Sequence, residues 1–158
     1  PLGFVDGPSV YGYVRGSPYR YVDKDGRVTY LVTNSDGLGH TALIIIGDDG
    51  SSFIYDPGGS YPHPEMGSGR TLSGNQVNIE NFLDFQGPNT SYLPIPTTPD
   101  QEQSIIGNID QEGGCTAFLC TQCTSNVLRD TSDLFKDLPS YWWPGNLRRE
   151  LLRRLRRR

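Results

Sequence analysis

The chain has 158 residues, close to the usual length of one domain, so we expect one hydrophobic core and no second domain. Its 19 Gly and 12 Pro indicate many turns, which favours short strands and loops with a few helices over a helical bundle or coiled coil. A helix that crosses a bilayer needs about 20 apolar residues. The longest apolar run covers only residues 42–46, so the sequence predicts no membrane-spanning helix.

Charge is distributed unevenly. Residues 148–158 contain seven Arg and one Glu, a net charge of +6, whereas the preceding residues carry 7 basic and 17 acidic side chains, a net charge of −10. An acidic body repels phosphate, so only the C-terminal tail could attract nucleic acid or anionic lipid. The tail could also fold onto its own acidic body or remain in solvent. We favour docking on its own domain because the charges are complementary.

Alternating and short apolar runs, bounded by turn residues, predict strands. They lie at residues 28–33, 40–47, 52–56 and 91–95. Helical spacing of apolar residues and helix-start signals predict four helices. They lie near residues 77–83, from Thr98 to Gly113–Gly114, near residues 122–130, and from Asn146 onward. Residues 60–76 are expected to form a loop, and residues 141–144 to pack in a core or an interface. Together these elements predict an α+β domain with a small antiparallel sheet packed with helices.

His40 and Asp56 are the first candidates for chemistry. The segment 37–39 before His40 contains two Gly, which leave room for a substrate or a second backbone. Across the predicted hairpin the two residues differ by an even number of positions, so they can share one face of the sheet. A carboxylate beside a histidine fixes its tautomer and stabilises the imidazolium. The alternatives are a hydrogen-bonding role at the strand end for His40 and a turn-capping role for Asp56.

The three cysteines supply a candidate nucleophile. A thiol in the first turn of a helix has a lowered pKa because the helix end carries positive charge and unpaired N–H groups. Cys123 has this setting if its helix starts there, and Cys115 is the rival if the helix starts earlier; Cys120 fits neither start. The remaining alternative is that all three are buried and inert.

Disulfide and metal readings of the same cysteines are weaker. All three lie within nine residues, where they cannot link distant parts of the chain, so no disulfide framework is expected. Cys120 and Cys123 have the spacing of a zinc knuckle, but zinc needs about four ligands and the chain has no second pair at that spacing. We therefore expect neither a metal nor another cofactor.

Residues 1–27 resemble the end of the Rhs repeat-associated core. The resemblance rests on three elements in order, at Pro1-Leu2-Gly3, Tyr11-Gly12-Tyr13-Val14 and Asp23-Lys24-Asp25-Gly26. In the Rhs family this segment joins a large shell to a variable C-terminal toxin. The resemblance implies a core remnant at 1–27 and a toxin domain at 28–158, secreted or delivered into a target cell, with the Rhs shell and a cognate immunity protein as partners.

Residues 38–146 resemble a circularly permuted papain-like domain, as in NlpC-type peptidases and lecithin:retinol acyltransferase-like enzymes. The resemblance rests on the order of His40 in Gly39–Ile45, Asp56 in Phe53–Asp56, and Cys123 in Gln122–Leu128. It implies that Cys123 attacks an acyl carbon, that His40 shuttles the proton and that Asp56 orients His40. Predicted toxins of this kind often have Asn directly before the Cys. Gln122 stands at that place and would stabilise the oxyanion together with the Cys123 N–H.

These resemblances favour a cysteine-dependent hydrolase that acts on an amide bond in a protein or in peptidoglycan, used in competition between bacteria. An acyltransferase or a deamidase could use the same Cys-His site. The alternative from another class is a non-catalytic module whose Arg-rich tail binds a membrane or nucleic acid.

Overall fold

The structure is a computed structural model that describes residues 28–47, 50–59, 61–66, 69–74, 77–116 and 118–157. The Rhs-like segment 1–27, and with it the expected domain boundary after residue 27, lies outside the described residues.

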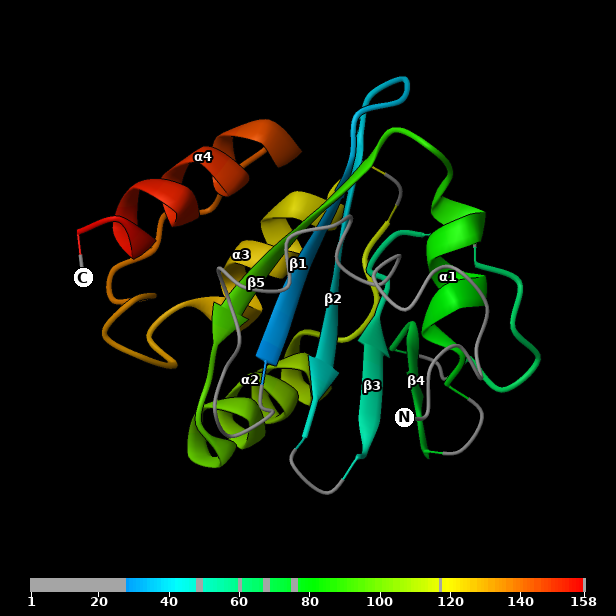
Figure 1. The fold of residues 1–158 in the computed structure, drawn as a ribbon, viewed down its shortest axis with the longest axis horizontal. Helices are drawn as coiled ribbons and strands as arrows, with labels where there is room; N and C mark the ends of the chain where they lie inside the picture. The colour runs from blue at the N-terminus through cyan, green and yellow to red at the C-terminus, as the bar shows by residue number, and fades with distance from the viewer. Residues whose placement is uncertain are drawn as a thin grey trace, which may run out of the picture.

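Five antiparallel strands form a single sheet, in the order β4-β3-β2-β1-β5 (Figure 1). They are β1 (Val28–Asn34), β2 (His40–Ile46), β3 (Ser52–Tyr55), β4 (Thr71–Ser73) and β5 (Thr90–Pro96). The predicted α+β class with a small antiparallel sheet is confirmed. The strand β4 lies inside the segment predicted as loop, because three residues are too few to show an alternating pattern and only their pairing with β3 makes them a strand.

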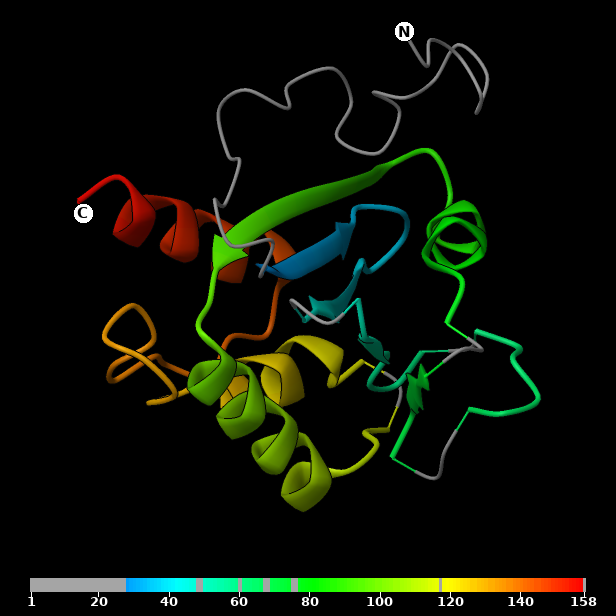
Figure 2. The ribbon, with the colours of Figure 1, turned by 60° about the horizontal axis from the view of Figure 1, so that its bottom comes forward.

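Four helices cover the two faces of this sheet. They are α1 (Ile79–Gln86), α2 (Pro99–Glu112), α3 (Cys120–Leu128) and α4 (Pro144–Leu155). Figure 2 shows α2 and α3 side by side on one face, with α1 away from them. Residues of α2, α3 and α4 share one core with β1, β2, β3 and β5, whereas Phe82 of α1 belongs to a second core.

Alternation along the strands decides which core each side chain joins. Leu31 and Leu43 are paired across β1 and β2 and pack with the three helices, whereas their neighbours Val32 and Ala42 face α1. Both faces of the central strands are therefore buried. Only strands covered on both sides read as nearly continuous apolar runs, which explains residues 42–46 of β2.

The start of α2 agrees with its sequence signal, but the starts of α3 and α4 do not. Thr98 and Gln101 form a capping box with Pro99 in the first turn. The helix α3 begins at Cys120, two residues before the predicted start, and the residue that precedes it, Leu119, makes no side-chain cap. The helix α4 begins at Pro144 rather than near Asn146. Neither helix start has a capping side chain, so no sequence signal marks it, and both predicted starts fell about two residues too late.

The C-terminal tail docks on its own domain, as favoured from its charge, but mainly through apolar contacts. Leu147 and Leu151 are fully buried in the main core. Arg154 donates hydrogen bonds to the backbone carbonyls of Leu134 and Lys136, at 2.9 and 2.8 Å, and pairs with Glu150 of its own helix. In the described part of the chain no helix has the length and apolar character needed to cross a bilayer.

Candidate active site

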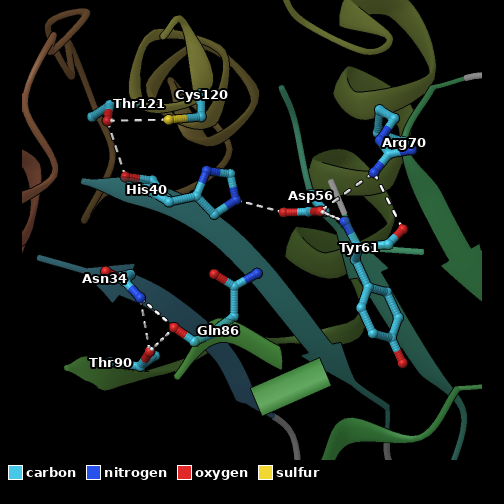
Figure 3. Close-up of polar contacts among 10 residues, drawn as sticks. Asn34, His40, Asp56, Tyr61, Arg70, Gln86, Thr90, Cys120 and Thr121 are labelled. Atoms are coloured by element: carbon cyan, nitrogen blue, oxygen red, sulfur yellow. Dashed lines mark hydrogen bonds and ion pairs between the residues drawn. The ribbon is translucent and has the colours of Figure 1, made fainter. Parts of the chain in front are cut away.

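His40 and Asp56 lie in contact, as their even spacing predicts. Tyr55 pairs with Leu43 across β2 and β3, which places Asp56 beyond the strand end on the same face as His40. The His40 Nε2 atom is 2.5 Å from the Asp56 Oδ1 atom (Figure 3). One fifth of the His40 side chain is exposed, whereas the Asp56 carboxylate is completely buried.

The Asp56 carboxylate is held by groups on its other side. Its Oδ2 atom accepts a hydrogen bond from the Tyr61 backbone N–H at 3.3 Å and lies 3.7 Å from the Arg70 guanidinium. A Cβ atom on Gly59 would come within 2.0–2.1 Å of the carboxylate, so only glycine fits at this position. The backbone carbonyl of Asp56 also accepts the Gly59 N–H at 3.0 Å.

The cysteine beside His40 is Cys120, the first residue of α3. Its sulfur lies 3.9 Å from the Thr121 hydroxyl, and the His40 ring and the Thr41 backbone N–H are near enough to lower the pKa of its thiol. Since Nε2 of His40 faces Asp56, its Nδ1 atom faces the sulfur (Figure 3). The imidazole therefore lies between a buried carboxylate and a thiol. This is the order of groups in a cysteine-histidine-acid triad.

The electrostatics of this arrangement favour charge separation. Burial alone lowers the pKa of His40, but the hydrogen bonds to Asp56 and Cys120 and their negative charges raise it from 6.5 to about 9. Burial alone raises the pKa of Cys120, but the hydrogen bond and charge of His40, the Thr41 N–H and the Thr121 hydroxyl lower it below its ordinary value of 9.0. Both shifts favour a thiolate beside an imidazolium.

The first turn of α3 offers donors for an oxyanion. The first N–H groups of a helix have no partner within the helix, and the N-cap Leu119 supplies no side-chain hydrogen bond. These groups and the positive end of the helix dipole act on the sulfur and on an oxygen bound next to it. The Cys120 backbone N–H is the donor closest in sequence to the reacting atom.

The prediction that Cys123 meets His40 is wrong. Cys123 forms a disulfide with Cys115, and its side chain belongs to the main core together with Val127. The rival prediction, Cys115, is wrong for the same reason. Because α3 begins at Cys120, Cys123 lies about one helical turn farther along, on the buried stripe that its spacing from Val127 defines. Cys120 is the free thiol among the three.

The predicted role of Gln122 changes with the nucleophile. Gln122 precedes Cys123, but it follows Cys120 by two residues. The residue directly before Cys120 is Leu119, whose side chain has no hydrogen-bond donor. The predicted contribution of Gln122 is therefore lost: the residue that precedes the nucleophile supplies no side-chain amide to stabilise an oxyanion.

The disulfide also bears on the hypothesis that the cysteines bind zinc. Among the described residues one group of potential ligands lies close together, Glu112 with Cys115 and Cys123, and it does not contain Cys120. Zinc binds thiolates, and in the disulfide neither sulfur is one. The knuckle spacing of Cys120 and Cys123 thus does not describe a shared site.

Several residues around the site were not predicted from the sequence. Thr41 and Thr121 join β2 to α3 through hydroxyls 3.0 Å apart, and Arg70 and Tyr61 hold the carboxylate. Figure 3 also shows the Gln86 side chain pointing toward the His40 ring. The spacing of Cys123 and Val127 on one helix face marks Cys123 as a core residue, but Cys120 lies on the same face by the same rule, so the sequence does not distinguish the two thiols.

Comparisons with protein-family models, with curated proteins and with solved structures found no match for this chain.

Proposed function

We propose that this protein is a cysteine-dependent hydrolase with Cys120 as its nucleophile, built on a circularly permuted papain-like arrangement. The observation that carries the proposal is the position of the His40 ring, whose Nε2 atom contacts Asp56 and whose other side lies toward Cys120 (Figure 3). The chain order of histidine on a strand, acid after the next strand and cysteine at a helix start agrees with the permuted arrangement. The lowered pKa of Cys120 adds support.

In the proposed reaction the Cys120 thiolate attacks the carbonyl carbon of an amide. A C–S bond forms, and the carbonyl oxygen becomes an oxyanion that accepts the Cys120 N–H. The His40 imidazolium gives its proton to the leaving nitrogen as the C–N bond breaks, which leaves an acyl-thioester. Water then attacks the thioester while neutral His40 takes its proton, the C–S bond breaks, and the carboxylic acid leaves as the Cys120 thiolate and the His40 imidazolium are restored. Asp56 stabilises the imidazolium in both steps.

We place the substrate amide in a protein or in peptidoglycan and the protein among toxins delivered into a target bacterium. Support comes from the Rhs-like elements in residues 1–27, ahead of the domain that carries the site. The proposal includes a cognate immunity protein in the producing cell and the Rhs shell of the parent chain. A permuted papain-like fold with a free thiol is compatible with both substrate classes.

The test combines growth arrest with product analysis. Expression of the parent chain in a bacterium should arrest growth, and Cys120→Ala and His40→Ala should abolish the arrest. The matched control is Cys115→Ala/Cys123→Ala, which removes both other thiols and should remain toxic. Analysis of digested peptides and cell-wall fragments should find new amine and carboxylate ends in equal amounts. Ammonia release or transfer to an added amine would instead identify a deamidase or an acyltransferase on the same residues.

The non-catalytic alternative gives the opposite pattern. A Cys120→Ala variant as toxic as the parent would contradict the hydrolase. Removal of the whole tail is unsuitable for this purpose because Leu151 is fully buried. Replacement of the exposed Arg153, Arg156 and Arg157 by Gln keeps the helix and removes charge; loss of toxicity in this variant alone would favour binding through the tail.

A further inference from the structure

Large apolar side chains are exposed in one place beside Cys120. Among the described residues, five large hydrophobic side chains are exposed, and four of them line a single pocket that also contains Cys120. These four are Leu38, Phe118, Trp142 and Trp143, exposed by 55–70 %. We call them the apolar rim. Scattered exposed hydrophobic residues are ordinary, but a contiguous group marks a binding surface.

The apolar rim is built by the segments that carry the reacting groups. Leu38 lies two residues before His40, and Phe118 lies two residues before Cys120. Phe118 has a φ of 75°, a conformation that is costly for an aromatic residue. Trp142 and Trp143 immediately precede α4, whose Pro144 lies against Gly39, where a Cβ atom would come within 3.0 Å of the Pro144 ring. A group bound here lies next to Cys120.

The size of the pocket limits its occupant. Its volume is about 110 Å³. A water molecule occupies about 30 Å³ in the liquid, and pockets that enclose a whole drug-sized ligand reach about 300–1,000 Å³. The pocket therefore suits one side chain rather than a whole small molecule or a long acyl chain.

A wider groove continues from the pocket and has a different lining. It measures about 340 Å³ and shares Leu38, Gly39, Trp143 and Pro144 with the pocket. The surface of this groove is mainly apolar, and the polar side chains of Ser35, Asn89, Ser91 and Arg148 lie along it. An apolar pocket that opens into a longer groove with polar side chains along it fits a peptide, which alternates side chains with backbone N–H and C=O groups.

We propose that the apolar rim selects a bulky apolar or aromatic side chain of a peptide substrate, next to the carbonyl that Cys120 attacks. This inference rests on the proposed hydrolase and names its substrate class. Binding of such a side chain excludes water from the sulfur and holds the carbonyl carbon near it. The groove then contacts the backbone of the same peptide.

The test uses acetyl-dipeptidyl chloromethyl ketones on the purified chain. The thiolate attacks the methylene carbon, a C–S bond forms and chloride leaves, so intact mass and peptide mapping give the rate at Cys120 without any known substrate. The set contains Phe-Ala, Ala-Phe, Ala-Ala and Asp-Ala, and iodoacetamide serves as a small reference reagent. Burial of a Phe side chain predicts that one of the two Phe reagents reacts roughly 10–100-fold faster than Ala-Ala.

Variants locate the preference. Trp143→Ala and Leu38→Ala should each remove most of the advantage of the Phe reagent while the iodoacetamide rate stays the same. Phe85→Ala is the matched control, since Phe85 is an exposed aromatic residue of α1 that does not line the pocket. It should retain the full preference. Retention of the iodoacetamide rate shows that a variant with altered preference is still folded at the site.

Two results would overturn the inference and leave the hydrolase standing. In the first, iodoacetamide reacts rapidly at Cys120 but all four dipeptidyl reagents react alike. In the second, a palmitoyl chloromethyl ketone reacts faster than either Phe reagent, which would assign the rim to a lipid. If iodoacetamide reacts with Cys120 no faster than with free cysteine and does so equally in His40→Ala, the hydrolase itself fails and this inference fails with it.

Discussion

The Thr41 hydroxyl lies 3.0 Å from the Thr121 hydroxyl, and this contact joins the start of β2 to the first turn of α3. Both residues are completely buried and each follows a residue of the candidate site, His40 and Cys120 respectively. The pair therefore sets the separation between the imidazole and the sulfur. This hydrogen bond joins two segments 80 residues apart in the chain, in addition to the packing of β2 against α3 in the main core.

Replacement of one member of this pair should destabilise the protein more than replacement of both. Thr121→Val leaves the Thr41 hydroxyl buried without its partner, so we expect the free energy of unfolding to fall by about 1–3 kcal/mol. Thr41→Val/Thr121→Val removes both polar groups at nearly constant shape and should recover much of that loss. Urea denaturation of the parent, both single variants and the double variant measures this coupling. Additive losses in the double variant would show that the hydroxyls do not interact.

The pH dependence of Cys120 should differ between alkylation and turnover. Alkylation needs only the thiolate, so its rate should rise through a pKa below 9.0 and then remain constant. Turnover also needs the His40 imidazolium, so it should decline as pH rises through about 9. The measurement compares iodoacetamide rates with hydrolysis of the preferred peptide between pH 5 and 10. An alkylation profile like that of an ordinary cysteine would contradict the ion pair.

Asp56→Asn tests the source of these pKa shifts. Loss of the negative charge should lower the pKa of His40, and the pKa of Cys120 should rise because the imidazolium that stabilises its thiolate is lost. At pH 6–7 alkylation should therefore slow, while above pH 9 it should approach the parent rate. A uniform loss at every pH would indicate a disrupted fold instead.

Gly59→Ala should displace the Asp56 carboxylate. The added Cβ would lie 2.0–2.1 Å from the carboxylate atoms, which forces the turn or the side chain to move. We expect a loss of unfolding free energy of about 1–3 kcal/mol, as in other overpacked sites, and an alkylation profile like that of Asp56→Asn. Gly107→Ala is the control, because a Cβ there meets nothing within 4 Å on α2 and should be neutral or stabilising.

Removal of the disulfide should affect stability without affecting the nucleophile. Closing the short loop between Cys115 and Cys123 stabilises the fold by about 2–3 kcal/mol in the chain-entropy model. Cys115→Ala/Cys123→Ala should therefore unfold at lower urea concentration and still alkylate rapidly at Cys120. Thiol titration of the folded parent without reductant should find one free thiol. Three free thiols, or rapid alkylation at Cys123, would contradict this arrangement.

Two neighbouring arginines of α4 should behave differently. Arg154 donates to two backbone carbonyls, which a shorter side chain leaves unpaired, so Arg154→Ala should cost about 1–3 kcal/mol of unfolding free energy. Among the described residues, the exposed Arg153 hydrogen-bonds to Glu150 of its own helix, so Arg153→Ala should have no measurable effect. Equal effects of the two variants would show that the docking of α4 does not depend on these carbonyls.

Local patterns in the sequence determined the strands β1, β2, β3 and β5, the capped start of α2 and the contact between His40 and Asp56. Each depends on alternation, spacing or a cap that involves residues close together in the chain. The tertiary structure alone decided which cysteine meets the histidine. The helix α3 begins without a capping side chain, so its start depends on contacts such as the one between Thr121 and Thr41. That start places Cys120 at the end of α3 beside His40, and Cys123 about one helical turn deeper in the core, where it forms the disulfide with Cys115.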